Sequence, residues 1–159
     1  MPTSSPSIVA QVVQAIVDRI DQVKTANGYP RDIKRIFYDK LPMGLELQPH
    51  EMAAVLVIDE GARLKHDKLR LDIDQTLRLQ LILERDEKDE AIYELFRSII
   101  KTLFANSPGA ERIDGFRGIH PSITQLVFLD YQTDLHMIDS NRIATMRLSV
   151  QYRTKLFDL

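Results

Sequence analysis

The feature that most constrains the fold of this chain is a regular alternation of apolar and polar residues from Lys68 to Glu84. The odd-numbered positions carry Leu69, Leu71, Ile73, Gln75, Leu77, Leu79, Leu81 and Leu83. A period of two places these side chains on one face of a β-strand, because successive side chains of a strand point to opposite faces. A helix, at ~100° per residue, would scatter them over more than half of its circumference. We therefore expect one long strand.

The predicted strand is too long for an ordinary small domain. At ~3.3 Å per residue it spans roughly 50 Å, about three times the usual length. Part of it should project beyond the domain body or bend near Gln75, the polar break in the apolar set. We expect the half at 77–83 to lie in the core and the outer half to be covered by another subunit. The predicted interface contains Leu69, Arg70, Leu71, Ile73 and Gln75.

Two amphipathic helices are predicted on either side of this region. The first covers Ile8–Val23, where apolar residues recur every three or four positions, with Ser7 as its N-cap and Asn27-Gly28 at its end. The second covers Ala91–Phe104 and follows acidic residues at 86–89, which the helix dipole favours at this end. Each helix should hold its apolar face against a sheet.

Four further segments have the composition of strands, at 32–39, 53–59, 125–137 and 142–156. The run Ala53–Ile58 is continuously apolar, which is typical of a strand buried on both faces. The charged stretch that begins at Glu60-Gly61 is predicted to connect it to the long strand, so that the two strands form a hairpin. The predicted fold class is therefore α+β. It is a mainly antiparallel sheet with two helices packed on it, in the order α-β-β-β-α-β-β, with a long protruding β-hairpin.

Length and composition fit a single globular domain over residues 1–159, with a flexible start at residues 1–7. The formal net charge of −2 excludes a nucleic-acid binder that depends on excess basic charge. The chain has no cysteine, which excludes disulfides, thiolate zinc sites and cysteine nucleophiles. No apolar run reaches the ~20 residues of a membrane-spanning helix, so we expect a soluble, intracellular protein.

The candidates for chemistry are weak, and each has a simpler explanation. Asp72 and Asp74 share one face of the long strand at a spacing that two metal ligands could use, but the alternation alone requires polar residues there. The histidines have no spacing that defines a zinc site; they are His50, His66, His120 and His136. No phosphate-binding glycine loop and no nucleophile elbow occurs. We expect no enzyme activity, no metal and no cofactor.

Arg147 and Arg153 share the polar face of the last predicted strand. They either contact an acidic partner or belong to a solvated strand face, and both interpretations stay open here. We include both arginines in the predicted interface.

The order of these elements resembles that of bacteriophage tail terminator, or tail-completion, proteins. A valine-rich N-terminal helix, a strand at 31–39, a hairpin with a long second arm, a helix and a final strand pair occur in this order. The runs at 54–61 (Ala-Val-Leu-Val-Ile-Asp-Glu-Gly) and 147–154 (Arg-Leu-Ser-Val-Gln-Tyr-Arg-Thr) are similar to the hairpin and the last strand of many such proteins. The similarity covers nearly the whole chain.

The resemblance implies a homo-oligomeric ring, usually of six copies, that caps the tail tube, stops its polymerisation and forms the head or neck docking surface. The implied partners are further copies of the chain, the tail tube protein and a head–tail connector or neck protein. DNA would pass through the channel without sequence-specific contact, and no membrane is involved. The implied location is the tail or neck of a virion. Long loops at 40–52 and 109–122 leave an adjacent connector ring as an alternative.

Two functions of other kinds stay open. The chain could be a small α+β dimeric ligand-binding or regulatory module, in which the long strand pairs with its twin across a two-fold axis. It could also be a metal-dependent hydrolase that uses Asp72 and Asp74. A ring, a dimer and a metal-dependent activity are separable by experiment.

Overall fold

The computed structural model describes residues 5–39, 47–104, 118–133, 137–138 and 141–156. The helices are α1 (Ile8–Ile20) and α2 (Asp89–Phe104), with single 3₁₀ turns at Thr25–Asn27 and Pro49–Glu51. The strands are β1 (Arg35–Tyr38), β2 (Ala54–Asp67), β3 (Arg70–Leu83), β4 (Ile123–Gln132), β5 (Met137–Ile138) and β6 (Asn141–Lys155). This confirms the predicted α+β class and the predicted order of the elements, with the two-residue β5 as an addition.

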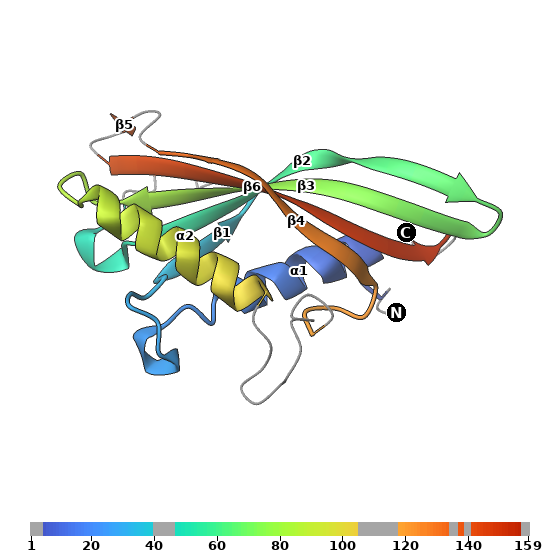
Figure 1. The fold of residues 1–159 in the computed structure, drawn as a ribbon, viewed down its shortest axis with the longest axis horizontal. Helices are drawn as coiled ribbons and strands as arrows, with labels where there is room; N and C mark the ends of the chain where they lie inside the picture. The colour runs from blue at the N-terminus through green and yellow to red at the C-terminus, as the bar shows by residue number, and fades with distance from the viewer. Residues whose placement is uncertain (1–4, 40–46, 105–117, 134–136, 139–140, 157–159) are drawn as a thin grey trace.

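The strands form one sheet in the order β1-β2-β3-β6-β4, and β5 pairs with β6. β1 runs parallel to β2, and the other pairs are antiparallel. Both helices lie on the same face of this sheet (Figure 1). None of the described helices is long and apolar enough to cross a membrane.

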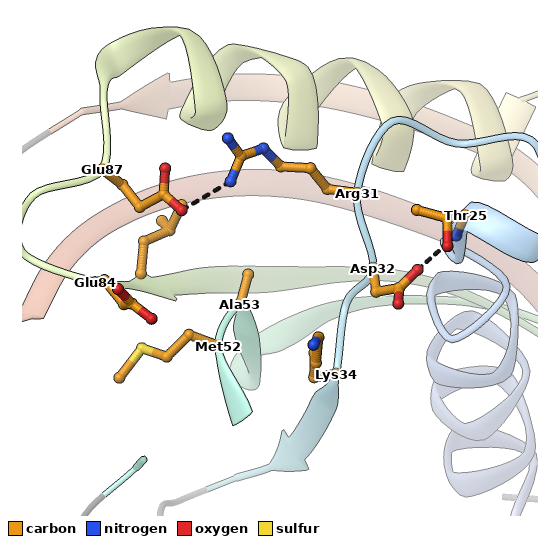
Figure 2. Close-up of a pocket in the computed structure, with 9 residues that line it drawn as sticks. Thr25, Arg31, Asp32, Lys34, Met52, Ala53, Glu84 and Glu87 are labelled. Atoms are coloured by element: carbon orange, nitrogen blue, oxygen red, sulfur yellow. Dashed lines mark hydrogen bonds and ion pairs between the residues drawn. The ribbon is translucent and has the colours of Figure 1, made fainter. Parts of the chain in front are cut away.

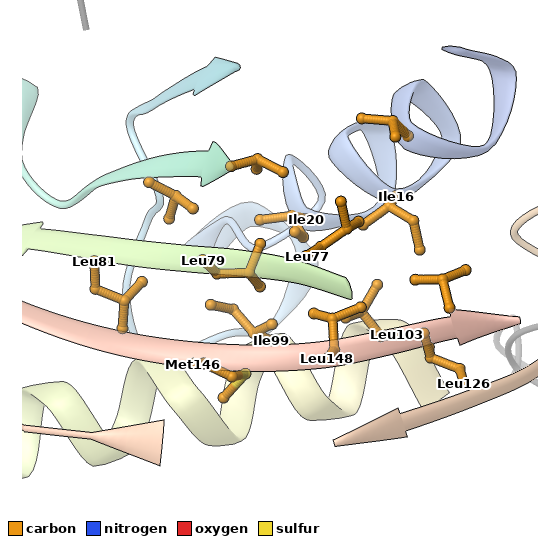
Figure 3. Packing of buried hydrophobic residues seen from close by; sticks show 14 of the residues in the cluster. Ile16, Ile20, Leu77, Leu79, Leu81, Ile99, Leu103, Leu126, Met146 and Leu148 are labelled. Carbon is orange, nitrogen blue, oxygen red and sulfur yellow. The ribbon is translucent and has the colours of Figure 1, made fainter. Parts of the chain in front are cut away.

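The main hydrophobic core lies between the two helices and the sheet. Figure 3 shows Ile16 and Ile20 of α1 and Ile99 of α2 close to the apolar face of β3 and β6. Leu77 and Leu79 of β3 are fully buried in this core. Burial of a leucine side chain contributes about 1.5–3 kcal/mol relative to its exposed state, so this layer dominates the stability of the fold.

The ends of the helices follow local chemistry. The Ser7 side chain accepts a hydrogen bond from the Ala10 N–H at 3.2 Å and caps α1, as predicted. α1 ends at Ile20 rather than near Val23, and Val23 is nevertheless buried. The chain then forms a 3₁₀ turn that Gly28 ends with a φ of 85°, a conformation that glycine adopts without steric cost. The valines therefore pack into the core without extending the helix.

The hairpin of β2 and β3 differs from the prediction in one respect. The charged stretch from Glu60 to Asp67, which was expected to be a connection, is the second half of β2. It pairs with β3 up to Asp67 opposite Arg70, and the turn is only Lys68-Leu69. Charge does not prevent a strand here, because the antiparallel ladder satisfies the backbone of both chains while the side chains stay in water. β3 itself has 14 residues, slightly fewer than predicted.

The outer half of β3 is also part of the core, which corrects a second expectation. Leu71 and Ile73 are 3% and 2% exposed, and they belong to the same cluster as Ile8 and Val12 of α1. The apolar face of this half therefore needs no second subunit to cover it. Leu69, in the turn, is 68% exposed.

This difference yields a prediction about stability. We expect Leu71→Ala to lower the free energy of unfolding by about 2–5 kcal/mol, as Leu79→Ala should, because each substitution leaves a cavity in a packed core. Leu69→Ala is the matched control and should change it by less than about 0.5 kcal/mol, as exposed positions do. Urea denaturation of the three variants measures these values. If Leu71→Ala behaved like Leu69→Ala, the outer half of β3 would not be core.

Candidate functional site

The candidate site is the hairpin arm, defined as residues 59–75 at the far end of β2 and β3. The outer end of the arm extends past both helices along the longest axis of the molecule (Figure 1). All residues of its tip, defined as residues 63–70, are exposed. The arm has a rigid base because β6 pairs with β3 as far as Arg70. It is therefore a three-stranded extension of the sheet rather than a loose loop.

A β-bulge marks the base of the arm. Between Asp59 and Ala62 the register of β2 shifts against β3, so that Glu60 and Gly61 face a single residue. Gly61 has a φ of 103°, and its N–H donates to the Asp59 carboxylate at 2.8 Å. A bulge increases the local twist and redirects side chains, so it sets the direction in which the arm leaves the sheet.

Gln75 lies in a buried polar network beside the bulge. Gln75 is 1% exposed, and its Oε1 accepts a hydrogen bond from the Tyr152 hydroxyl at 3.0 Å. Its Nε2 donates to an Asp59 oxygen at 2.9 Å. Burial, followed by the negative charge of Asp59, raises the pKa of Tyr152 to about 12. Gln75 thus interrupts the apolar face as a satisfied internal group, and the expectation that it borders a subunit interface is not supported by its position.

Two of the predicted site residues, Arg70 and Arg153, lie near the tip on the face away from the helices. The Arg153 Nε donates to an Asp72 oxygen at 2.6 Å, and this contact lowers the pKa of Asp72. Asp74 accepts a hydrogen bond from the Ser149 hydroxyl. Both carboxylates therefore have partners within the chain. Among the described residues, no group of three or more acidic, histidine or cysteine side chains could hold a metal ion.

Arg147 occupies the middle of the same open face. It lies directly opposite Arg78 in the β3–β6 register, which places two like charges side by side. Glu60, from the bulge, lies 3.3 Å from Arg147 and 3.8 Å from Arg78, and Asp130 of β4 accepts from Arg147 at 3.0 Å. The carboxylates offset the repulsion. Arg147 therefore pairs with carboxylates of its own chain. The sequence left two interpretations open for this residue, a solvated strand face and a contact with an acidic partner.

The tip carries two exposed leucines among its charges. Leu69 lies in the turn, and Leu64 of β2 is 59% exposed. A hollow of about 850 Å³ lies beside the turn and is bounded by Leu69, Arg70 and Arg153, among others. Leu64 was missed in the sequence because it stands alone between charged residues, and only its register opposite Ile73 shows that it faces the helix side of the sheet.

The outer side of β2 has no partner strand over the length of the arm. β1 pairs with β2 only from Ala54 to Val57, and no other strand in the described part of the chain pairs with this side. An unpaired edge presents backbone N–H and C=O groups that another strand can bind. The arm therefore has both an exposed apolar pair and a free edge.

A second hollow, of about 290 Å³, lies near the start of α2 (Figure 2). Its charged groups bind one another: Arg31 donates to Glu87 at 2.8 Å, and the Thr25 N–H donates to Asp32 at 2.5 Å. These bonds raise the pKa of Arg31 and lower that of Asp32. The Thr25–Asp32 bond lies within the segment before β1, and Arg31 joins this segment to the turn before α2 through Glu87 and to α2 through Glu94. Both contacts have a structural role.

The histidines occupy separate places. The His66 ring lies 2.8 Å from the Lys68 carbonyl at the turn, and the Ser122 N–H donates to the His120 ring at 3.1 Å. His50 belongs to the 3₁₀ turn at Pro49–Glu51. His136 lies outside the described residues, as do 40–46 and 109–117 of the two predicted loops.

No family model matches this chain, and no curated protein matches it. Among solved structures, it is similar to a chain from a structure titled "Virion of native gene transfer agent (GTA) particle". The TM-score is 0.49 and the sequence identity 12%, over 93% of this chain and 96% of the other. A similarity at this level assigns no function.

The buried network yields a prediction. Tyr152→Phe and Gln75→Leu should each lower the free energy of unfolding by about 1–3 kcal/mol, because each leaves a buried polar atom without its partner. The double variant should lose less than the sum of the two. Urea denaturation in a double-mutant cycle measures the coupling. Additive losses would show that the two side chains do not interact.

The raised pKa of Tyr152 predicts a dependence on pH. Between pH 10 and about 12, the unfolded chain releases the phenolic proton while the folded chain keeps it. Stability should therefore be complete below pH 10 and fall as the pH rises through this window. The midpoint of urea unfolding across pH 9–12 measures the effect, and Tyr152→Phe is the control. If the two curves fell in parallel, Tyr152 would titrate normally.

Proposed function

We propose that this protein is a structural assembly protein of a phage-type virion, of the tail terminator kind. Copies of the chain form a closed ring at the end of the tail tube, stop its polymerisation and provide the surface on which the head or neck docks. The observation that carries this proposal is the hairpin arm, a rigid extension with exposed leucines and a free strand edge. Exposed apolar side chains beside an unpaired edge are typical of a binding surface.

The structure limits which of the predicted interface residues can serve. Leu69 and Arg70 are exposed at the tip, and we add Leu64 to them. Leu71, Ile73 and Gln75 act indirectly, because their burial holds the β3 strand of the arm against the core. Arg147 and Arg153 keep their carboxylate partners and shape the open face of the sheet.

The partners follow from this role. The ring contacts further copies of the chain, most simply six in total, together with the tail tube protein and a connector or neck protein. A formal charge of −2 suits a channel that lets DNA pass without holding it, since excess basic charge would bind the phosphates. The protein acts in the tail or neck of the particle without catalysis or cofactor.

The proposal predicts a ring in solution or on tail tubes. Native mass spectrometry should give a closed multiple of the 18.3 kDa chain, with six as the expected number. The double variant Leu64→Asp, Leu69→Asp should shift this mass to the monomer without a change in melting temperature, because both side chains are exposed. Tyr38→Asp, at an exposed position on β1, is the matched control and should keep the ring.

Two results would contradict this proposal. A monomer both free and in a mixture with tail tubes would exclude ring assembly. A dimer that persists on dilution would favour the alternative of a two-fold regulatory or ligand-binding module.

A further inference from the structure

A second exposed apolar surface lies far from the arm, between α2 and β4. It is a groove of about 620 Å³ lined by Glu90, Tyr93, Phe96, Arg97, Ile100, Tyr131 and Met146. Three of its side chains are large and exposed: Tyr93 is 43% exposed, Ile100 39% and Tyr131 59%. Large apolar side chains gathered in one hollow mark an interaction site more often than scattered ones do.

The groove is held in shape by its own aromatic contacts. Tyr131 of β4 packs against Phe96 with ring centroids 5.4 Å apart, and against Tyr93 edge-to-face at 6.4 Å. Such ring pairs contribute about 0.5–1.5 kcal/mol each beyond their buried area. The surface is therefore ordered before any partner binds, which reduces the entropy cost of association.

The charges of the molecule are segregated between the arm and the groove. The tip carries four basic side chains and one acidic, a formal charge of +3. Residues 84–94, which lead into α2 and start it, carry six acidic side chains and two basic, a formal charge of −4. Arg31 pairs with Glu87 and Glu94, and Arg142 with Asp89, while the groove lining itself carries Glu90 and Arg97, one charge of each sign. The groove therefore supplies apolar contact, and the acidic segment at 84–94 beside it complements the basic tip.

One chain cannot bring these surfaces together. The start of α2 and the tip of the hairpin lie toward opposite ends of the longest axis (Figure 1). Tyr131 is in register with Met146, which pairs with Leu79 of β3. Leu79 is ten residues from Leu69 along the strand, or roughly 33 Å at ~3.3 Å per residue. Contact between arm and groove therefore requires two copies.

The strand edges support the same pairing. β2 is unpaired on its outer side beyond Val57, and β4 is the last strand on the other side of the sheet. Leu64 faces the helix side of the sheet, since it is opposite Ile73. If the arm of one copy lies along β4 of another, Leu64 points toward the exposed face of α2. The free strand edges, the apolar side chains and the charges then all favour the same contact between two copies.

We propose that the arm of one copy docks into the α2–β4 groove of the next, with Leu64 as its apolar anchor. This inference rests on the proposed ring and names the contact that builds it. The contact is head-to-tail, because it joins two different surfaces, and such contacts close into rings when the rotation between copies permits. A two-fold contact of arm with arm would bring two tips of charge +3 together, which is unfavourable.

A mixing experiment tests the proposal. The arm variant is Leu64→Asp, Lys65→Glu, and the groove variant is Tyr93→Ser, Ile100→Lys, all at exposed positions. Each variant alone should lose the ring and give a monomer in native mass spectrometry. The melting temperature of the arm variant should stay near that of the wild type, and that of the groove variant should fall by only a few degrees, through loss of the Tyr93–Tyr131 ring pair. An equimolar mixture should give a 1:1 dimer, since one variant keeps its groove and the other its arm.

The outcomes separate this inference from the proposed function. A ring that survives in the groove variant would overturn the docking contact and leave the ring proposal standing. A dimer of the groove variant alone, absent from the arm variant, would show arm-to-arm contact and overturn the inference too. A wild-type chain that is monomeric in every condition would overturn both.

The absence of cysteine in this chain allows a direct second readout. Leu64→Cys and Tyr93→Cys chains, mixed under mild oxidation, should form a disulfide-linked dimer of the two variants. Each single variant, oxidised alone, is the control and should stay a monomer on a denaturing gel. A strong dimer from Leu64→Cys alone would mean that two arms meet, against the proposal.

Discussion

The pairing of β3 with a strand on each side is the interaction on which the rest of the structure depends. β3 is bonded to β2 along one edge and to β6 along the other, from Arg70 to Leu83. Because side chains alternate between faces, this double pairing fixes the apolar and the charged face in one step. The helices then cover the apolar face, and the arm remains where β1 and α2 do not reach (Figure 1).

At the base of the arm, β3 stays paired with both neighbouring strands although β2 has a bulge there. The bulge at Glu60-Gly61 breaks the ladder, and a buried glutamine is costly unless it is satisfied. Gln75 has partners on both neighbouring strands, Asp59 on β2 and Tyr152 on β6. The network therefore joins β2, β3 and β6 at the bulge, so the arm continues as a paired sheet and not as a flexible loop.

The sequence predicts the fold where the apolar residues follow one clear period. It predicts the candidate site only in part. The alternation at 68–84 predicted β3 and the buried inner leucines, because a period of two has one structural solution, and the other segments' patterns predicted the order of the elements. The alternation could not show that Leu71 and Ile73 join the buried cluster that contains α1, since that depends on packing between distant segments. The composition of the stretch at 60–67 predicts a connection, because its strand pairing depends on backbone bonds that composition does not encode. The groove joins α2 to Tyr131 of β4, and no local pattern relates the two.

A free strand edge can cause aggregation as well as provide a binding surface, and the charges of this chain limit aggregation. Arg63, Lys65 and Asp67 line the edge of the arm, and charged edges resist indiscriminate pairing. Like charge on every tip also disfavours contact between tips, so within the described surface the complementary region lies at the other end of another copy. Such a contact repeats a fixed rotation, and the right-handed twist of the sheet sets the angle between its two ends. In the proposed assembly, the twist along β3 therefore decides whether the chain of contacts closes into a ring or continues as a fibre.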